Sequence, residues 1–399
     1  MIGLKSELVI GVIPGKRDWL AREAAISLHC CFKHDSKGES CRFLRESGRS
    51  DTRDTLQIPF RLWPPGLMAA GKPNISPTKL VRNVTGDEGR TMKYLNARVR
   101  AAYAECRKLA TRHYENFPVA SWLVPSDKRD ALAVIYAFAR CADDFADEPD
   151  VQDRLAALGR WQSNLDRCLA GKAENPVFVA LSDVVQRFSL RSEHFENLLC
   201  AFESDVRVNR HPDFAALLAY CRYSANPVGR LVLELFGHRD PELFALSDSI
   251  CTALQLTNFW QDAAIDLRRD RIYLPLEDLA RFGLSVTDLH CLAGSCDGTP
   301  WQALLDRWQA LMVTQVRRTR ELFEGGKLLP ERVAPELRCQ LRLTWLGGMA
   351  ILSRIESAGY DVFRRRPSLS KRDFVRLYFR SRRALPLEAP PIASETSRV

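Results

Sequence analysis

Four carboxylates fall within six residues near the end of one apolar segment of this chain. Residues 140–148 read Arg-Cys-Ala-Asp-Asp-Phe-Ala-Asp-Glu. Apolar residues such as Ile135 and Phe138 precede them at helical spacing, so the segment is predicted to be a helix. Asp143 and Asp147 then share one face, because they stand four residues apart. Like charges at this spacing repel each other, which predicts a compensating charge, and a divalent cation is the clearest candidate.

A second acidic stretch lies much further along the chain. Asn258, Asp262 and Asp266 follow one another at intervals of four, so on a helix they form one polar stripe. The turns before them are apolar, which predicts a buried helix, and carboxylates are rarely buried unless they are paired or bind metal. Either cluster alone would also suit a solvated surface or a salt bridge to arginine. Together they offer only hard oxygen ligands, which favours Mg²⁺ or Mn²⁺ over zinc or copper.

The two clusters together indicate one kind of chemistry. Magnesium usually binds together with substrate phosphates, so two facing acidic helices are predicted to hold Mg²⁺ ions against a diphosphate. The nearby Arg268, Arg269 and Arg271 would take its remaining charge. Ionisation of the carbon–oxygen bond would leave a carbocation, which needs apolar and aromatic walls that exclude water. The aromatic candidates, each of which would equally suit ordinary core packing, are Phe117, Trp122, Tyr136, Phe138, Tyr220, Tyr223, Phe259 and Trp260.

Composition argues against several other classes of protein. The formal net charge of +9 is spread along the sequence without a basic stripe of interleaved aromatics, so we expect no nucleic-acid partner. There is no glycine-rich phosphate loop, which argues against an ATPase or GTPase. The sequence contains no apolar run of about 18 residues, the length needed to span a membrane. The 12 cysteines form no Cys-x-x-Cys pair, which is typical of a protein in a reducing cytoplasm.

Helical periodicity recurs from about residue 94, and strand-like alternation is absent. The sequence therefore predicts an all-α fold of about ten helices around one core. We expect this domain to span residues 92–383, with residues 1–91 as an extension outside it and residues 384–399 as a disordered tail. The expected helices span about 95–114, 126–148, 150–170, 177–189, 192–207, 212–235, 241–268, 300–326, 331–357 and 371–383.

Local signals mark several of these helix ends. Ser126 is expected to cap the first acidic helix, and Asp240 before Pro241 is expected to cap the second. Ser285 and Asp288 have the spacing of a capping box, and Gly359 suits a left-handed helix end. In the helix over 212–235, Pro227 should produce a kink, because proline lacks the amide hydrogen that the helix needs.

The two acidic stretches resemble a known pair of motifs. Tyr136–Glu148 is similar to the first aspartate motif of squalene and phytoene synthases, and Leu254–Asp266, followed by Asp270–Pro275, is similar to the second. The resemblance covers about residues 95–380 and implies the isoprenoid-synthase type of helical bundle, one domain with a central active-site cavity. It also implies functional residues. The expected metal ligands are Asp143, Asp147, Asn258, Asp262 and Asp266; the expected diphosphate contacts are Arg140 and Arg271, assisted by Tyr273.

Two further stretches resemble the hydroxysqualene-forming branch of that family, from the bacterial hopanoid pathway. They are Glu115–Ser121 and Tyr220–Arg230, in which Asn116 and Asn226 stand where other branches carry smaller residues. This resemblance implies conversion of presqualene diphosphate to hydroxysqualene and diphosphate, with no nicotinamide cofactor. We expect Asn226, with Tyr223 or Asn116, to hold the water that captures the cation. Asn116, Phe117 and Tyr136 are expected to contact the substrate.

Two other functions remain open at this point. The chain could condense two prenyl diphosphates to presqualene diphosphate or phytoene, since the same metals serve both reactions. A non-enzymatic assembly factor of the same fold is disfavoured, because both aspartate motifs are intact here.

The expected surroundings follow from a prenyl diphosphate, which is a lipid substrate. We expect a cytoplasmic protein at the inner membrane face that is paired in function with a presqualene diphosphate synthase. Peripheral membrane contact is expected through residues 363–366 and the basic face of 371–383, which carries Lys371, Arg372, Arg376 and Arg380.

Overall fold

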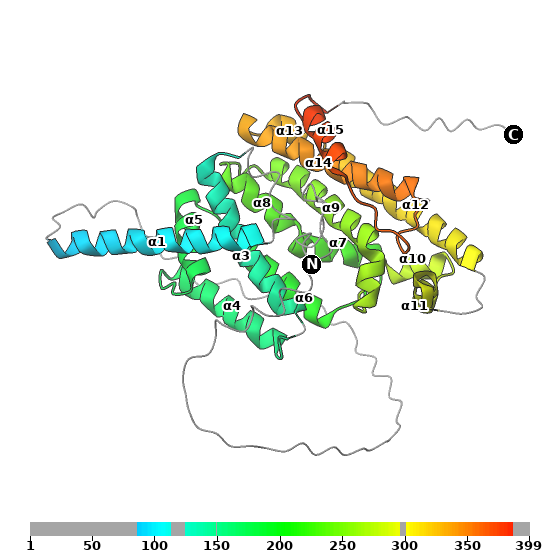
Figure 1. Ribbon diagram of the computed structural model, residues 1–399, viewed down its shortest axis with the longest axis horizontal. Helices are drawn as coiled ribbons and strands as arrows, with labels where there is room; N and C mark the ends of the chain where they lie inside the picture. The colour runs from blue at the N-terminus through cyan, green and yellow to red at the C-terminus, as the bar shows by residue number, and fades with distance from the viewer. Residues whose placement is uncertain (1–85, 113–123, 149, 296–300, 386–399) are drawn as a thin grey trace, which may run out of the picture. The chain divides into compact units, whose positions relative to one another are not determined.

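The computed structural model describes residues 86–112, 124–148, 150–295 and 301–385 of the 399-residue chain (Figure 1). Within these ranges every regular element is a helix, apart from an isolated bridge between Arg210 and Ile272. The predicted all-α class is therefore confirmed. The predicted extension lies mostly outside the described residues, and so does most of the predicted tail, although Leu385 at its start is buried.

The helices follow the expected order along the chain. They are α1 (Gly86–Arg112), α3 (Ser126–Asp147), α4 (Arg154–Leu169), α5 (Pro176–Phe188), α6 (Glu193–Arg207), α7 (Phe214–Ser224), α8 (Asn226–Leu235), α9 (Pro241–Arg268), α10 (Leu276–Arg281), α11 (Val286–His290), the π-helical turn η2 (Cys291–Ser295), α12 (Trp301–Gly326), α13 (Leu329–Arg332), α14 (Pro335–Ser357) and α15 (Lys371–Ser381). From Glu88 onward they belong to one compact unit. No described helix is long and apolar enough to cross a membrane.

Most of the predicted helix ends are confirmed by their hydrogen bonds. Asp240 caps α9 by accepting a hydrogen bond from the Glu242 amide at 2.8 Å. Ser285 and Asp288 form the predicted capping box at the start of α11. One prediction was wrong: Ser126 is the first residue of α3, and no side chain caps that end.

Three helix boundaries differ from the sequence prediction. The single helix expected over 212–235 is two helices, because the chain breaks at Ala225. Pro227 then lies in the first turn of α8, where its missing amide hydrogen removes no helical hydrogen bond. The helix expected over 331–357 is likewise interrupted before Pro335, where α14 begins. The first helix begins at Gly86, earlier than the expected residue 95.

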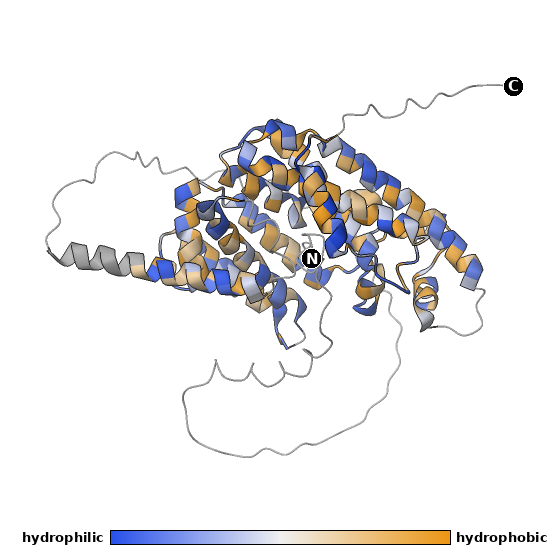
Figure 2. Cartoon of the chain, turned by 45° about the horizontal axis from the view of Figure 1, so that its top comes forward, coloured by the Kyte–Doolittle hydropathy of each residue, from blue (hydrophilic) through white to orange (hydrophobic). Residues whose placement is uncertain are grey.

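Each of the two acidic helices has its own apolar support, which corrects the expectation of one core. Helix α3 packs against α4, α5 and α6 in one cluster of buried residues, and α9 packs against α12, α14 and α8 in another. Helix α8 contributes to both clusters: Leu231 and Leu235 belong to the α3 cluster, whereas Leu233 belongs to the α9 cluster. Most helices are amphipathic, and Figure 2 shows hydrophobic and hydrophilic residues alternating along them.

Close packing of three helices yields the first prediction. A Cβ atom added at Gly348 on α14 would lie 2.2 Å from Phe323 Cζ on α12 and 3.1 Å from Leu254 Cδ2 on α9. Phe323 is fully buried, so close packing leaves it little space to move aside. We expect Gly348→Ala to lower the free energy of unfolding by about 1–3 kcal/mol in urea titrations.

Gly347 provides the matched control, because nothing lies within 4 Å of a Cβ atom added there. Gly347→Ala should leave the free energy of unfolding unchanged or raise it by about 0.5–1 kcal/mol, since alanine favours the helix. If both variants unfold at the same denaturant concentration, the proposed packing of α9, α12 and α14 is wrong.

Candidate active site

An ion pair joins the two predicted motifs. Arg271 follows the end of α9, and its Nη2 atom lies 2.6 Å from Oδ1 of Asp147, at the end of α3. Arg269, which is exposed, approaches the same carboxylate at 3.8 Å, and Arg268 is also exposed. Asp270, between Arg269 and Arg271, adopts a left-handed backbone with φ of 56°. The structure therefore brings the ends of α3 and α9 together.

The first motif is buried together with its own arginine. Asp143 is 1% exposed, and Arg140 is also buried. The Arg140 guanidinium lies 3.6 Å from the Asp143 carboxylate and 2.5 Å from that of Asp144. Positive charge at this distance offsets the repulsion expected between the carboxylates of one helix face. Glu148, at the C-terminal cap, is exposed.

The second motif forms a polar stripe on α9 that is longer than the sequence analysis recognised. Asn258 and Asp266 are buried, as predicted, and Asp262 is partly buried. Thr252 and Gln255 are also buried and continue the stripe toward the N-terminus of α9. The three-residue spacing between Gln255 and Asn258 was the signal that could have identified the extension.

Burial alters the acidity of Asp266. Removal from water, and then the nearby charge of Asp262, raise the pKa of the Asp266 carboxyl to about 7. Such a carboxylate is costly to keep charged without a cation nearby.

Arg366 is a site residue that the sequence analysis missed. Its guanidinium makes a two-point ion pair with Asp262, and one of the contacts, from Nη2 to Oδ2, is 3.2 Å long. The neighbouring Pro367 carbonyl accepts a hydrogen bond from the Gln261 side chain at 2.5 Å. The segment after α14 therefore lies against the acidic face of α9.

These contacts give Arg366 a different role from the one expected for residues 363–366. We expected this segment to offer its arginines to lipid headgroups. Arg366 is instead paired with Asp262. Arg364 lies 4.0 Å from the centre of the Trp301 ring, but it and Arg365 are exposed, so lipid contact through these two residues stays a prediction. A run of three arginines gave no local indication of these long-range partners.

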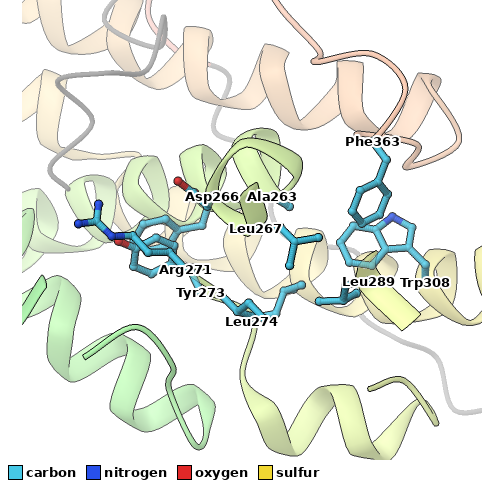
Figure 3. Close-up of a pocket in the computed structure, with 11 residues that line it drawn as sticks. Ala263, Asp266, Leu267, Arg271, Tyr273, Leu274, Leu289, Trp308 and Phe363 are labelled. Atoms are coloured by element: carbon cyan, nitrogen blue, oxygen red, sulfur yellow. The ribbon is translucent and has the colours of Figure 1, made fainter. Parts of the chain in front are cut away.

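One pocket is lined by Asp266 and Arg271 together with mainly apolar residues (Figure 3). Asp266, Arg271 and Tyr273 line one side, and Leu289, Trp308 and Phe363 line the other. Phe259 also lines the pocket, and its ring stacks on that of Tyr273 at 3.8 Å between centroids. The pocket thus combines a charged end with an aromatic and aliphatic wall.

Buried polar side chains lie next to Tyr273 in this wall. Tyr220 donates a hydrogen bond to Asp205 at 2.7 Å, and its ring lies 6.0 Å from that of Tyr273. Burial raises the pKa of both tyrosines well above its usual range. His211 stacks on Tyr273, and burial lowers the pKa of its imidazole to about 4, so it is neutral at pH 7.

The remaining predicted residues are distributed differently. Phe138 and Trp260 are fully buried in the two apolar clusters, so they serve as core residues. Tyr136 is buried beside Ala110 and Ala133. Tyr223 is 43% exposed, and Asn226 is buried at the start of α8.

Three of the predicted residues, Asn116, Phe117 and Trp122, lie outside the described part of the chain.

The Asn226 amide has a defined orientation. Its Oδ1 atom accepts a hydrogen bond from the Thr252 hydroxyl at 2.9 Å. The NH₂ end of the same amide therefore points away from Thr252 and can donate elsewhere.

The residues present fit a metal ion that is held together with a diphosphate. Within the described ranges no three His, Cys, Asp or Glu side chains gather closely enough to form a complete metal cage. Magnesium does not need one, because it usually binds through one or two carboxylates, waters and substrate phosphates. The buried atoms of the described chain that lack a hydrogen-bond partner include Asn258 Oδ1 and Arg271 Nη1. An amide oxygen suits a hard cation, and a guanidinium suits a phosphate.

Comparison with known proteins agrees with this site. The family model for squalene/phytoene synthase matches residues 110–373, which include both acidic helices. The chain belongs to the squalene/phytoene synthase family. Members of this family act on prenyl diphosphates and use divalent metal ions.

Individual relatives cover most of the described helices. A 15-cis-phytoene synthase from Synechococcus elongatus is 34% identical over 280 residues, covering 66% of this chain and 87% of the relative. A solved squalene synthase, HpnC from Alicyclobacillus acidocaldarius, is 40% identical with a TM-score of 0.61, covering 66% of this chain and 96% of that chain. A solved dehydrosqualene synthase, at 24% identity and a TM-score of 0.63, shares the fold.

The buried position of Asp143 leads to a prediction for catalysis. Asp143→Asn keeps the shape of the side chain and removes its charge beside Arg140. We expect turnover of a prenyl diphosphate to fall about 100-fold or more, because a charged group that stabilises the reaction is lost. The thermal unfolding midpoint should stay the same or rise.

Glu148→Gln is the matched control, since it removes a carboxylate from the same motif at an exposed position. Its turnover should equal that of the unmodified enzyme. An Asp143→Asn variant with full activity would contradict the assignment of α3 to the active site.

Proposed function

We propose that this enzyme converts presqualene diphosphate to hydroxysqualene and diphosphate. The observation that carries the proposal is the buried Asn226 amide, which Thr252 holds in one orientation. An oriented amide in a protected site can bind the single water that an alcohol product requires. The 40% identity to the squalene synthase HpnC supports a substrate of the squalene series.

Departure of the diphosphate would depend on the charged end of the pocket. Asp143, Asp147, Asn258, Asp262 and Asp266 would hold Mg²⁺, or Mn²⁺, which neutralises the leaving group when bound. Arg271 and Arg140 would bind the diphosphate oxygens, and Arg271 has a buried nitrogen, Nη1, without a partner among the described residues. Tyr273 lies beside them as part of the same wall.

The apolar wall would then protect the carbocation. After the carbon–oxygen bond breaks, both bonding electrons leave with the diphosphate. The stacked rings of Phe259 and Tyr273 present π faces, which stabilise a nearby cation, and the aliphatic residues keep bulk water away. Rearrangement of the cyclopropylcarbinyl cation can therefore precede its capture.

Water capture would complete the reaction without a reductant. A water bound to the Asn226 NH₂ group attacks the rearranged cation and loses one proton to the solvent. The products are the alcohol and diphosphate, so no nicotinamide is consumed. Tyr223 is no longer part of this proposal, because a side chain that is 43% exposed cannot hold a water apart from bulk solvent.

A second function deserves the same test. Head-to-head condensation of two prenyl diphosphates is favoured by the curated relatives, since phytoene synthases from Synechococcus elongatus and Arthrospira platensis are 34% and 32% identical to this chain. A non-enzymatic assembly factor of this fold is less favoured, because the motif carboxylates are retained. The cytoplasmic location and the pairing with a presqualene diphosphate synthase stay predictions.

Product analysis separates these functions. We expect the purified enzyme with Mg²⁺ to release hydroxysqualene from presqualene diphosphate, at the same rate with and without reduced nicotinamide. Chelation of divalent metal should stop the reaction. Turnover of farnesyl or geranylgeranyl diphosphate alone, with no reaction of presqualene diphosphate, would assign the condensation instead.

The same assay tests Asn226. Asn226→Ala should lower the fraction of alcohol among the products, and eliminated hydrocarbons should replace it. Thr252→Val should give a smaller shift in the same direction, because it removes only the hydrogen bond that orients the Asn226 amide. If both variants keep the alcohol fraction of the unmodified enzyme, the captured water is held elsewhere.

A further inference from the structure

The outward face of α15 combines exposed apolar side chains with positive charge. Val375 and Phe379 are 51% and 62% exposed, which makes them the two most exposed large hydrophobic side chains in the described part of the chain. They stand four residues apart and so lie on one face of the helix. Other exposed hydrophobic residues, such as Leu169 and Val313, are scattered over different helices.

The fold itself does not require these two side chains. Helix α15 packs on α14, as Figure 1 shows. Phe374, Leu377 and Tyr378 are partly buried, and Ser381 is buried with its hydroxyl 3.3 Å from the Cys339 sulfur. These residues form the partly buried side of α15, whereas Val375 and Phe379 face the solvent.

Basic residues surround the exposed pair. Six exposed cationic side chains lie on or just after the helix: Lys371, Arg372, Arg376, Arg380, Arg382 and Arg383. None of the ion pairs between described residues uses any of them. The one acidic residue of the helix, Asp373, is turned to the helix start, where it accepts from Ser370 and pairs with Arg354 at 2.7 Å.

We propose that this face of α15 docks the enzyme on an anionic lipid surface. Arginine side chains reach lipid headgroups while valine and phenylalanine enter the boundary of the acyl chains, the arrangement typical of interfacial helices. Positive charge without acidic partners complements an anionic leaflet. A lipid substrate, as proposed above, would be a reason for docking, but the exposed side chains of α15 support the docking surface by themselves.

Vesicle flotation of the full chain tests this surface. The probes are vesicles of pure phosphatidylcholine and vesicles of equal parts phosphatidylcholine and phosphatidylglycerol. We expect the protein to float with the anionic vesicles only, and high salt should weaken binding at least about tenfold. Val375→Ser with Phe379→Ser should weaken binding at least about tenfold, as should Arg372→Gln with Arg376→Gln and Arg380→Gln.

The matched control is Leu169→Ser with Val313→Ser, which removes two exposed apolar side chains from other helices. It should bind like the unmodified protein. Thermal unfolding should be the same for all variants, and turnover of detergent-dispersed presqualene diphosphate should not change. Turnover reports on the proposed reaction and flotation reports on docking, so the two proposals can fail separately.

Three results would overturn the proposal. The first is absence of binding to anionic vesicles. The second is binding that the α15 variants leave unchanged. The third is that the protein does not bind vesicles but needs the same side chains to bind nucleic acid, or to self-associate in sedimentation experiments. Either result would assign this face to a different partner.

Discussion

Burial of carboxylates is the constraint on which the rest of this structure depends. Asp143 and Asp266 are withdrawn from water, so a negative charge on either is costly unless positive charge lies nearby. Arg140 lies beside Asp143 within α3. Arg271, after the end of α9, pairs with Asp147 of α3, and Arg366, after α14, pairs with Asp262 of α9. The acidic residues therefore organise chain segments that are far apart in sequence around one site.

The apolar clusters support this arrangement. Helices α3 and α9 are each anchored in a separate set of buried side chains, and α8 contacts both sets. The carboxylates are thus presented by two independently supported helices rather than by loops. Support of this kind keeps charged groups in position during a reaction in which charge develops and must be stabilised at once.

Local signals were sufficient for most of the fold and for the acidic motifs. The periodicity around Asp143 and Asp262, and the cap at Asp240, depend on residues near in sequence, so the sequence predicted them. Arg366 could not be predicted as a site residue, because its pairing with Asp262 spans 104 residues and has no local signature. The break at Ala225 was missed for another reason: a proline suits a kink inside a helix and the first turn of a new helix equally well.

The central claim is that carboxylates from both acidic helices bind one metal–diphosphate complex. Calorimetric titration of Mg²⁺ into the enzyme with inorganic diphosphate tests it most directly, using Asp147→Asn, Asp262→Asn and the double variant. Either single variant should abolish most of the binding heat, and the double variant should add little to that loss, because one complex needs both helices. Losses that are independent and additive, or binding that survives either single variant, would contradict the account.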